Sequence, residues 1–103
     1  MKYYGFSIKF TAQTGKRDAL ATILLESAEQ LKNNTDCLHY LIGLADEQDA
    51  VWVYETWTSK EAHDAALEPE EAKALIRQAM PLIAGVSSQV DTELLGGKGL
   101  LAG

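Results

Sequence analysis

A carboxylate, an indole and an imidazole lie close together in the sequence, at Glu55, Trp57 and His63. An imidazole titrates near neutral pH, so His63 is suited to take the proton of a phenol. Glu55 stands among aromatic residues in an apolar run, where a carboxylate must be paired or functional. The alternative for Glu55 is a structural pairing with Lys9 or Arg77. The alternative for His63 is a place on the surface.

Further aromatic side chains are suited to hold a flat substrate beside these groups. The candidates for substrate contact are Tyr54, Trp52, His39, Tyr40 and Phe6, and Tyr4 belongs to the same aromatic set. Aromatic side chains also bury large areas and stack with one another, so packing in the core and between subunits is the alternative for most of them. For His39 the alternative is a structural hydrogen bond.

Other chemical signatures are missing from the sequence. The glycine-rich segment 96–99 opens no predicted helix, so it does not make a phosphate-binding loop. Cys37, His39 and His63 lack the spacing of a zinc site, although Cys37 and His39 share a predicted strand face, which leaves a weak site open. Cys37 is interpreted as an inert core residue. We therefore expect no metal and no organic cofactor.

The composition excludes several classes of partner. The 103 residues carry a net charge of −6, and the nine Lys and Arg residues form no cluster. An acidic chain without a basic patch is unsuited to nucleic acids and to anionic membranes. No apolar run approaches the roughly 20 residues of a membrane span, and the first residues do not look like a signal peptide. With a single cysteine, these features predict a cytoplasmic protein.

The periodicity of apolar residues predicts the elements that position the site. Alternation predicts strands over residues 3–12, 37–45, 50–57 and 86–95. Helical spacing predicts helices over about 16–32, from the cap at 58 to about 67, and from 69 to the glycine at 85. The order βαββαβ predicts an α+β, ferredoxin-like fold, with a four-stranded antiparallel sheet and helices on one face. We expect one domain over 1–95 and a flexible or partner-contacting tail over 96–103.

Local signals set the expected ends of the helices. Thr14 and Thr58 are predicted N-caps, because their hydroxyls can accept from free backbone N–H groups. Pro69 is expected at the first helical position. Pro81 is expected to weaken the last turn of the third helix, and Gly85 to end that helix.

The strand over 50–57 is apolar on both faces, which predicts a homodimer. Val51 and Val53 share one face, and Trp52 and Tyr54 share the other. A strand of this kind is normally covered on both sides. The helices cover one side, and a second copy is the simplest cover for the other, because symmetric pairing requires only one patch.

The residues Val-Trp-Val-Tyr-Glu-Thr-Trp-Thr-Ser-Lys-Glu-Ala-His at 51–63 resemble the core motif of antibiotic-biosynthesis monooxygenase domains. In that motif a hydrophobic strand ends in Tyr-Glu-x-Trp and leads through a cap into a helix that carries a His. The similarity extends over about residues 3–94 and is greatest to the short bacterial quinol monooxygenase branch. It implies a dimeric α/β barrel, in which the sheets of two protomers face each other.

The resemblance also implies a function: a cofactor-independent monooxygenase acting on a small aromatic or quinol-like substrate in a cleft between sheet and helices. Molecular oxygen would be the co-substrate, and neither metal nor flavin would be required. Trp57 would orient the substrate or oxygen, and His63 would act as base or stabilise the anion. Tyr54 and Glu55 would support them.

Other functions occur on the same fold and stay open. These are an isomerase of the kind that acts on an autoinducer, and a non-enzymatic binding or stress-related dimer. Haem-degrading relatives carry an Asn on the first strand and a His ten positions after the Trp. This chain has no Asn in 3–12, and the residue ten positions after Trp57 is Leu67. A cavity of at least about 300 Å³ with His63 or His39 at its wall would favour an enzyme over a packed structural domain.

Overall fold

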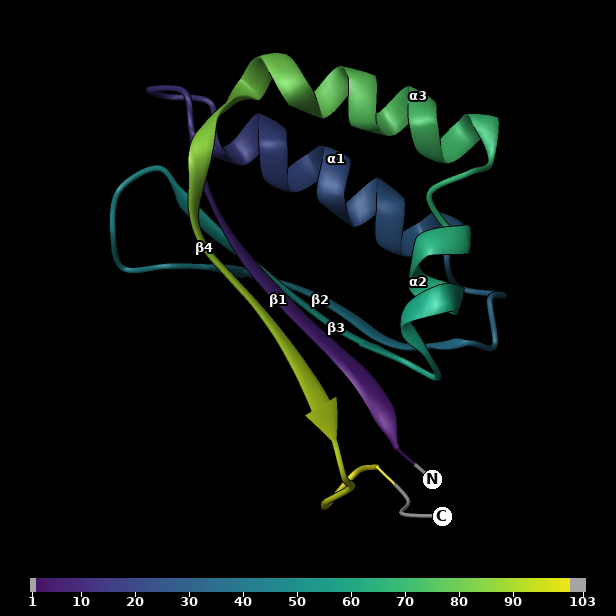
Figure 1. The fold of residues 1–103 in the computed structure, drawn as a ribbon. Helices are drawn as coiled ribbons and strands as arrows, with labels where there is room; N and C mark the ends of the chain where they lie inside the picture. Colours follow the sequence, from purple (N-terminus) through teal and green to yellow (C-terminus); the bar gives the residue numbers. More distant parts are fainter. Residues whose placement is uncertain (1, 101–103) are drawn as a thin grey trace.

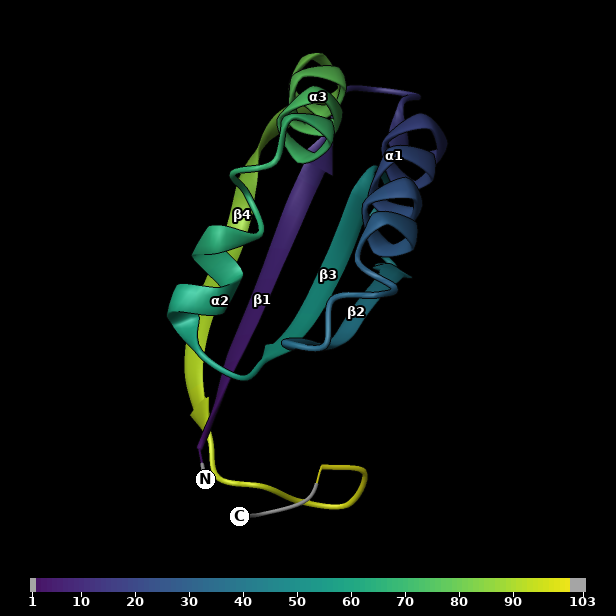
Figure 2. The same ribbon diagram turned by 90° about the vertical axis from the view of Figure 1, so that its right-hand side faces the viewer.

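The computed structural model of the chain describes residues 2–100, and it has two layers. One layer is a four-stranded antiparallel sheet with the strand order β2-β3-β1-β4, and the helices form the other layer on one face of the sheet (Figures 1 and 2). The elements are β1 (Tyr3–Ala12), α1 (Arg17–Gln30), β2 (Cys37–Leu44), β3 (Ala50–Trp57), α2 (Lys60–Ala65), α3 (Glu70–Ala79), the 3₁₀ turn η1 (Met80–Leu82) and β4 (Ile83–Leu94). The predicted ferredoxin-like βαββαβ fold is confirmed.

The strand register decides which side chains face the helices. In the β1–β3 pair, Phe6 lies opposite Glu55 and Ser7 lies opposite Tyr54. Because successive side chains of a strand point to opposite faces, Phe6 and Glu55 face the helices, and Ser7 and Tyr54 face the open side. The predicted division of β3 into two faces is therefore confirmed.

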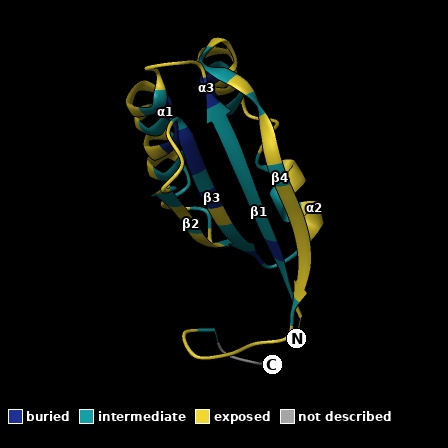
Figure 3. Cartoon of the chain, turned by 90° about the vertical axis from the view of Figure 1, so that its left-hand side faces the viewer, coloured by how far each residue is buried: buried dark blue, intermediate teal, exposed yellow. Residues whose placement is uncertain are grey.

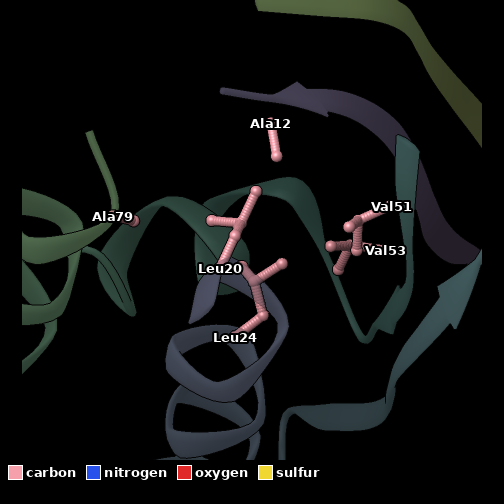
Figure 4. Close-up of a cluster of buried hydrophobic side chains, with 6 residues drawn as sticks. All are labelled: Ala12, Leu20, Leu24, Val51, Val53 and Ala79. Carbon is pink, nitrogen blue, oxygen red and sulfur yellow. The ribbon is translucent and has the colours of Figure 1, made fainter. Parts of the chain in front are cut away.

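A cluster of buried apolar side chains lies between α1 and the sheet. Leu20 and Leu24 project from α1 toward Val51 and Val53 of β3 (Figure 4). Leu20 and Val51 are fully excluded from solvent. Burial of an apolar side chain of this size contributes about 1.5–3 kcal/mol, so these contacts fix α1 on the sheet.

The face of the sheet that points away from the helices, called here the open face, is more exposed to solvent than the helix-facing side. β4 is exposed along most of its length, whereas β3 has several buried positions (Figure 3). Leu41, Tyr54 and Val90 are respectively 56%, 44% and 47% exposed on this open face. Nothing in residues 2–100 covers them.

The N-cap of α2 is Ser59 rather than the predicted Thr58. The Ser59 Oγ accepts a hydrogen bond from the backbone N–H of Ala62 at 3.0 Å. Thr58 is occupied elsewhere, since its hydroxyl donates to Asp36 Oδ1 at 3.0 Å and its backbone N–H donates to the Asp36 carbonyl at 2.9 Å. These two bonds hold the end of β3 against the start of β2, so the helix starts one residue later.

Three other predicted helix ends differ from the structure and one is confirmed. Lys16 caps α1 without a side-chain bond, because the chain turns through a left-handed residue after Thr14. Pro69 is the N-cap of α3 and not its first residue. Gly85 lies inside β4 and does not end a helix, because the chain is already extended from residue 83. Pro81 does break the last turn, which becomes the 3₁₀ turn η1.

The segment after β4 runs beyond the sheet near the N-terminal end of β1 (Figure 1). Within it, Gly97 and Leu100 form an isolated antiparallel bridge that closes a turn. The predicted tail covers 96–103, and its last three residues lie outside the described residues. In the described part of the chain, no helix is long and apolar enough to cross a membrane.

Candidate active site

A cavity of about 400 Å³ lies between the helix-facing side of the sheet and the helices. Its floor comes from β1, β2 and β3, and its walls from α1, α2 and α3. Most of the lining is apolar, and the polar side chains in it include Ser27, Tyr40, Glu55 and His63. The size and the position of His63 at the wall match the arrangement expected of an enzyme.

The structure brings five of the eight predicted site residues together and separates the other three. Those that line the cavity are Phe6, Tyr40, Glu55, Trp57 and His63. Trp52 and Tyr54 instead stack on each other on the open face, with ring centroids 5.4 Å apart. His39 is exposed and lies opposite Thr56, also on the open face. None of these three lines the cavity.

Glu55 is held by its neighbour on the same strand face. Trp57 Nε1 donates to Glu55 Oε1 at 2.9 Å, and only 8% of the Glu55 side chain is exposed. Burial raises the pKa of Glu55, while the hydrogen bond from Trp57 and positive charge on His63 act in the opposite direction. The predicted partner Lys9 pairs with Glu47 instead, so that structural pairing is wrong.

His63 lies at the cavity wall and not on the surface. Its side chain is 13% exposed, its Nε2 is 3.7 Å from Glu55 Oε1, and its Nδ1 is 2.9 Å from Asp64 Oδ1. The ring centroid is 5.1 Å from that of Phe6 and 5.5 Å from that of Trp57. The alternative of a surface histidine is therefore wrong. The imidazole is clamped by aromatic rings, with one nitrogen directed toward a buried carboxylate.

Tyr4 also packs against the imidazole of His63. Its ring centroid is 5.5 Å from that of His63, and its hydroxyl donates to Asp91 Oδ2 at 2.8 Å. Burial and the Asp91 carboxylate raise the pKa of Tyr4, so the phenol stays protonated. The Tyr4 side chain thus ties the His63 ring to β4.

Tyr40 adds a second phenol to the site, opposite Glu55 on β2. Burial and the negative charge of Glu55 raise the pKa of Tyr40, although a hydrogen bond from Ser27 partly opposes them. The hydroxyl of Tyr40 is therefore a hydrogen-bond donor and not a base at neutral pH.

Cys37 and His39 do not share a strand face, contrary to the expectation from alternation. A register shift between them places Cys37 opposite Trp57 and His39 opposite Thr56. Burial, followed by the charge of Glu55, raises the pKa of the Cys37 thiol to about 11, which keeps it protonated and unreactive. In residues 2–100, no group of three or more His, Cys, Asp and Glu side chains is placed to hold a metal ion.

Sequence reasoning missed Ser27, Asp64 and Asp91, which contact Tyr40, His63 and Tyr4 respectively. Ser27 and Asp91 are remote in sequence from the residues they contact, and no local pattern marks them. Asp64 follows His63 directly, which is a local signal, but neighbours on a helix normally point apart.

The arrangement is suited to proton transfer from a flat apolar molecule. The apolar walls can hold rings, and the basic groups lie together at one end of the cavity. Glu55 and His63 are within reach of one bound hydroxyl, and Tyr40 can donate to an oxygen atom.

Comparison with known proteins agrees with this geometry. The model of the family described as Antibiotic biosynthesis monooxygenase matches residues 4–78. Among solved structures, a protein of Chloroflexus aurantiacus J-10-fl, provisionally named an antibiotic biosynthesis monooxygenase, is 35% identical with a TM-score of 0.87, over 96% of this chain and 99% of that chain. A similarly named protein of Caulobacter crescentus CB15 is 23% identical with a TM-score of 0.77, over 89% and 87%.

A third structure shares the fold alone. It is a conserved protein of unknown function from Bacteroides thetaiotaomicron VPI-5482, described as a possible oxidoreductase, which is 13% identical with a TM-score of 0.79 over 90% of this chain and 98% of that chain. No curated protein matches the sequence. The family match covers most of the chain, including the strand and helix that carry Glu55, Trp57 and His63. The chain belongs to the antibiotic biosynthesis monooxygenase family.

Proposed function

We propose that the protein is a cofactor-independent monooxygenase for a small phenol or quinol-like molecule. The observation that carries the proposal is the position of His63, between Glu55 and three aromatic rings at the wall of an apolar cavity of about 400 Å³. A cavity of this volume is of the size that holds a small aromatic ligand.

The reaction can be written for a phenol with a hydrogen on the ring carbon para to its hydroxyl. His63 takes the phenolic proton, and the electron-rich phenolate forms a C–O bond between the para carbon and molecular oxygen. His63 returns the proton to the outer oxygen of the resulting peroxide. Loss of the ring hydrogen as a proton then breaks the O–O bond. The hydroxide that leaves combines with this proton to form water, and a quinone remains.

The balance of this reaction requires no other reductant. Phenol plus O₂ gives quinone plus water, and the substrate supplies all four electrons. A positioned general base contributes roughly 10²–10⁴-fold to such a rate, which is the share we assign to His63. Trp57 orients the ring, Glu55 holds the Trp57 indole, and Tyr40 donates to the developing oxyanion.

The protein is further proposed to act as a homodimer in the cytoplasm. The support for the dimer is the open face of the sheet, where Leu41, Tyr54 and Val90 are about half exposed beside the stacked ring of Trp52. Soluble monomers rarely expose large apolar patches, and a second copy can cover these side chains through a symmetric contact.

The test is oxygen uptake by the purified, chelator-treated protein, with naphthols that have a free para position and with hydroquinones. Isotope-labelled oxygen shows whether one oxygen atom enters the product. The variants are His63→Gln and Trp57→Phe, and the control is Asp46→Asn in the exposed β2–β3 turn.

The expected result is labelled quinone from the wild type and the control, formed faster than by autoxidation, and a loss of about 100-fold in His63→Gln. Equal rates in wild type and His63→Gln would contradict the role of the imidazole. Oxidation of hydroquinones without incorporated label would indicate an oxidase. No uptake with any substrate would favour the isomerase or the binding protein.

A further inference from the structure

Asp64 contacts the side of the His63 ring that faces away from Glu55. Its Oδ1 lies 2.9 Å from His63 Nδ1, and its Oδ2 accepts a hydrogen bond from Lys60 Nζ at 3.0 Å. Both oxygens of the carboxylate are therefore engaged. Neighbouring residues on a helix usually point apart, and Lys60, one turn earlier, holds the carboxylate in this unusual position.

The contact decides which nitrogen of His63 carries the hydrogen. The hydrogen bonds with His63 and Lys60 lower the pKa of Asp64, so the carboxylate is ionised near neutral pH. An ionised carboxylate only accepts hydrogen bonds, so the Nδ1 that faces it must carry a hydrogen. A neutral imidazole has a single N–H, and its Nε2 is then left as the basic nitrogen.

The Nε2 atom faces the reacting end of the cavity. It lies 3.7 Å from Glu55 Oε1, which is beyond hydrogen-bonding distance, and that oxygen already accepts from Trp57 Nε1 at 2.9 Å. Within the described residues, Nε2 makes no hydrogen bond to the protein. It is therefore free to accept a proton from a bound molecule.

We propose that Asp64 is the positioning residue of this site, which accepts the Nδ1 hydrogen of His63 and so keeps Nε2 basic and directed into the cavity. Asp64 is not itself part of the cavity lining, and its side chain is 53% exposed. It acts through His63 and does not touch the substrate. When Nε2 takes a proton, the charge of Asp64 stabilises the imidazolium. The effect on turnover rests on the proposed function, whereas the effect on the hydrogen position does not.

The first measurement is the ¹⁵N NMR spectrum of the imidazole nitrogens near neutral pH, which distinguishes the two neutral tautomers. The chain has two histidines, so the signals of His63 are assigned by comparison with His39→Gln. The variants are Asp64→Ala and Asp64→Asn, with Asp46→Asn as the matched control for loss of an exposed carboxylate. Backbone amide spectra show that each variant is folded.

The expected result is an Nδ1–H tautomer in the wild type and in Asp46→Asn. Asp64→Ala shifts the population toward Nε2–H, which a free histidine side chain prefers. Asp64→Asn shifts the population in the same direction, because its single amide oxygen accepts from Lys60 Nζ and its NH₂ group then donates to His63 Nδ1. A wild-type spectrum dominated by Nε2–H, or no change in Asp64→Ala, would overturn the proposal whether or not the protein has any activity.

The second measurement applies to a substrate that is turned over. A wrong tautomer should lower kcat by about tenfold or more with little change in KM, because the lost interaction acts on the transition state. Asp64→Asn should show a similar loss, because its NH₂ group donates to Nδ1 and so also favours the Nε2–H tautomer. If Asp64→Ala loses the Nδ1–H tautomer of His63 but keeps the wild-type kcat, the role of the contact in catalysis is overturned. If no substrate turns over, the proposed function fails, and the NMR result still decides the position of the hydrogen.

Discussion

Trp57 and Glu55 are two positions apart on the helix-facing side of β3, and the indole N–H of Trp57 donates to the carboxylate of Glu55 at 2.9 Å. The strand itself thus supplies a partner for its only carboxylate. The hydrogen bond gives the buried Glu55 carboxylate a partner, and it orients the indole at the cavity floor. A positive charge on His63, whose Nε2 is 3.7 Å from Glu55 Oε1, also favours the ionised carboxylate.

The first prediction concerns the pH dependence of stability in Glu55→Gln. The pKa of Glu55 is raised by burial in the folded state, so the native protein binds this proton more tightly than the unfolded chain does. Ionised Glu55 therefore costs stability as the pH rises above the ordinary range of a carboxyl group. Relative to wild type, Glu55→Gln should gain stability as the pH rises above the ordinary range of a carboxyl group, as followed by urea denaturation.

The control for this prediction is Glu61→Gln on the exposed side of α2, which also removes one negative charge. Its stability relative to wild type should change much less with pH than that of Glu55→Gln. A Glu55→Gln protein that loses stability relative to wild type as the pH rises would contradict the assigned direction.

The second prediction concerns the core that fixes α1. Leu20→Ala should lower the free energy of unfolding by about 2–5 kcal/mol, because Leu20 is fully buried against β3 and its truncation leaves a cavity. Leu25→Ala on the same helix is the matched control, since 57% of Leu25 is exposed, and its cost should stay below about 1 kcal/mol. Chemical denaturation measures both, and equal losses would show that α1 packs differently.

The third prediction concerns association through the open face. Tyr54→Lys places a charge in the centre of the apolar patch and should convert a dimer to a monomer, as measured by sedimentation over a range of concentrations. Leu25→Lys, which puts the same side chain on the exposed side of α1, should leave the dimer intact. A wild-type protein that is monomeric at all concentrations would refute the dimer directly.

The fourth prediction concerns the charge of the ligand. The cavity lining includes the acidic residues Glu55 and Glu71, and it contains no Lys or Arg among the described residues. An anionic ligand would enter this lining without a counter-charge. A naphthol that carries a carboxylate should therefore bind at least about tenfold more weakly than the neutral naphthol, by calorimetric titration. Equal or tighter binding of the anion would show that another site holds it.

The parts of the fold that periodicity decides were predictable from the sequence. In β3, the alternation of apolar and aromatic residues over 50–57 correctly separated Val51 and Val53 from Trp52 and Tyr54, and the structure places the first pair against the helices. The capping signal after this strand also correctly predicted that His63 lies on a short helix. Both features depend on residues that are near one another in the chain.

The remaining contacts depend on register and on competition between local partners. Glu55 pairs with a neighbour on its own strand rather than with the predicted Lys9, and Thr58 is held by Asp36, which moves the helix cap to Ser59. One bulge puts Cys37 on the opposite face from the one that strict alternation predicts. A one-residue shift reverses every later side chain of a strand, and no local pattern shows where the shift lies.

The two sides of the cavity are free to change to very different degrees in evolution. Its floor is built from paired strands, where an insertion or deletion would turn side chains such as Glu55 and Trp57 out of the site. Its outer wall includes the short connection from Ala66 to Pro69 between α2 and α3, where added or lost residues alter no strand register. Relatives can therefore differ in the depth and shape of the cavity through this connection, while the strands that carry Glu55 and Trp57 keep their register.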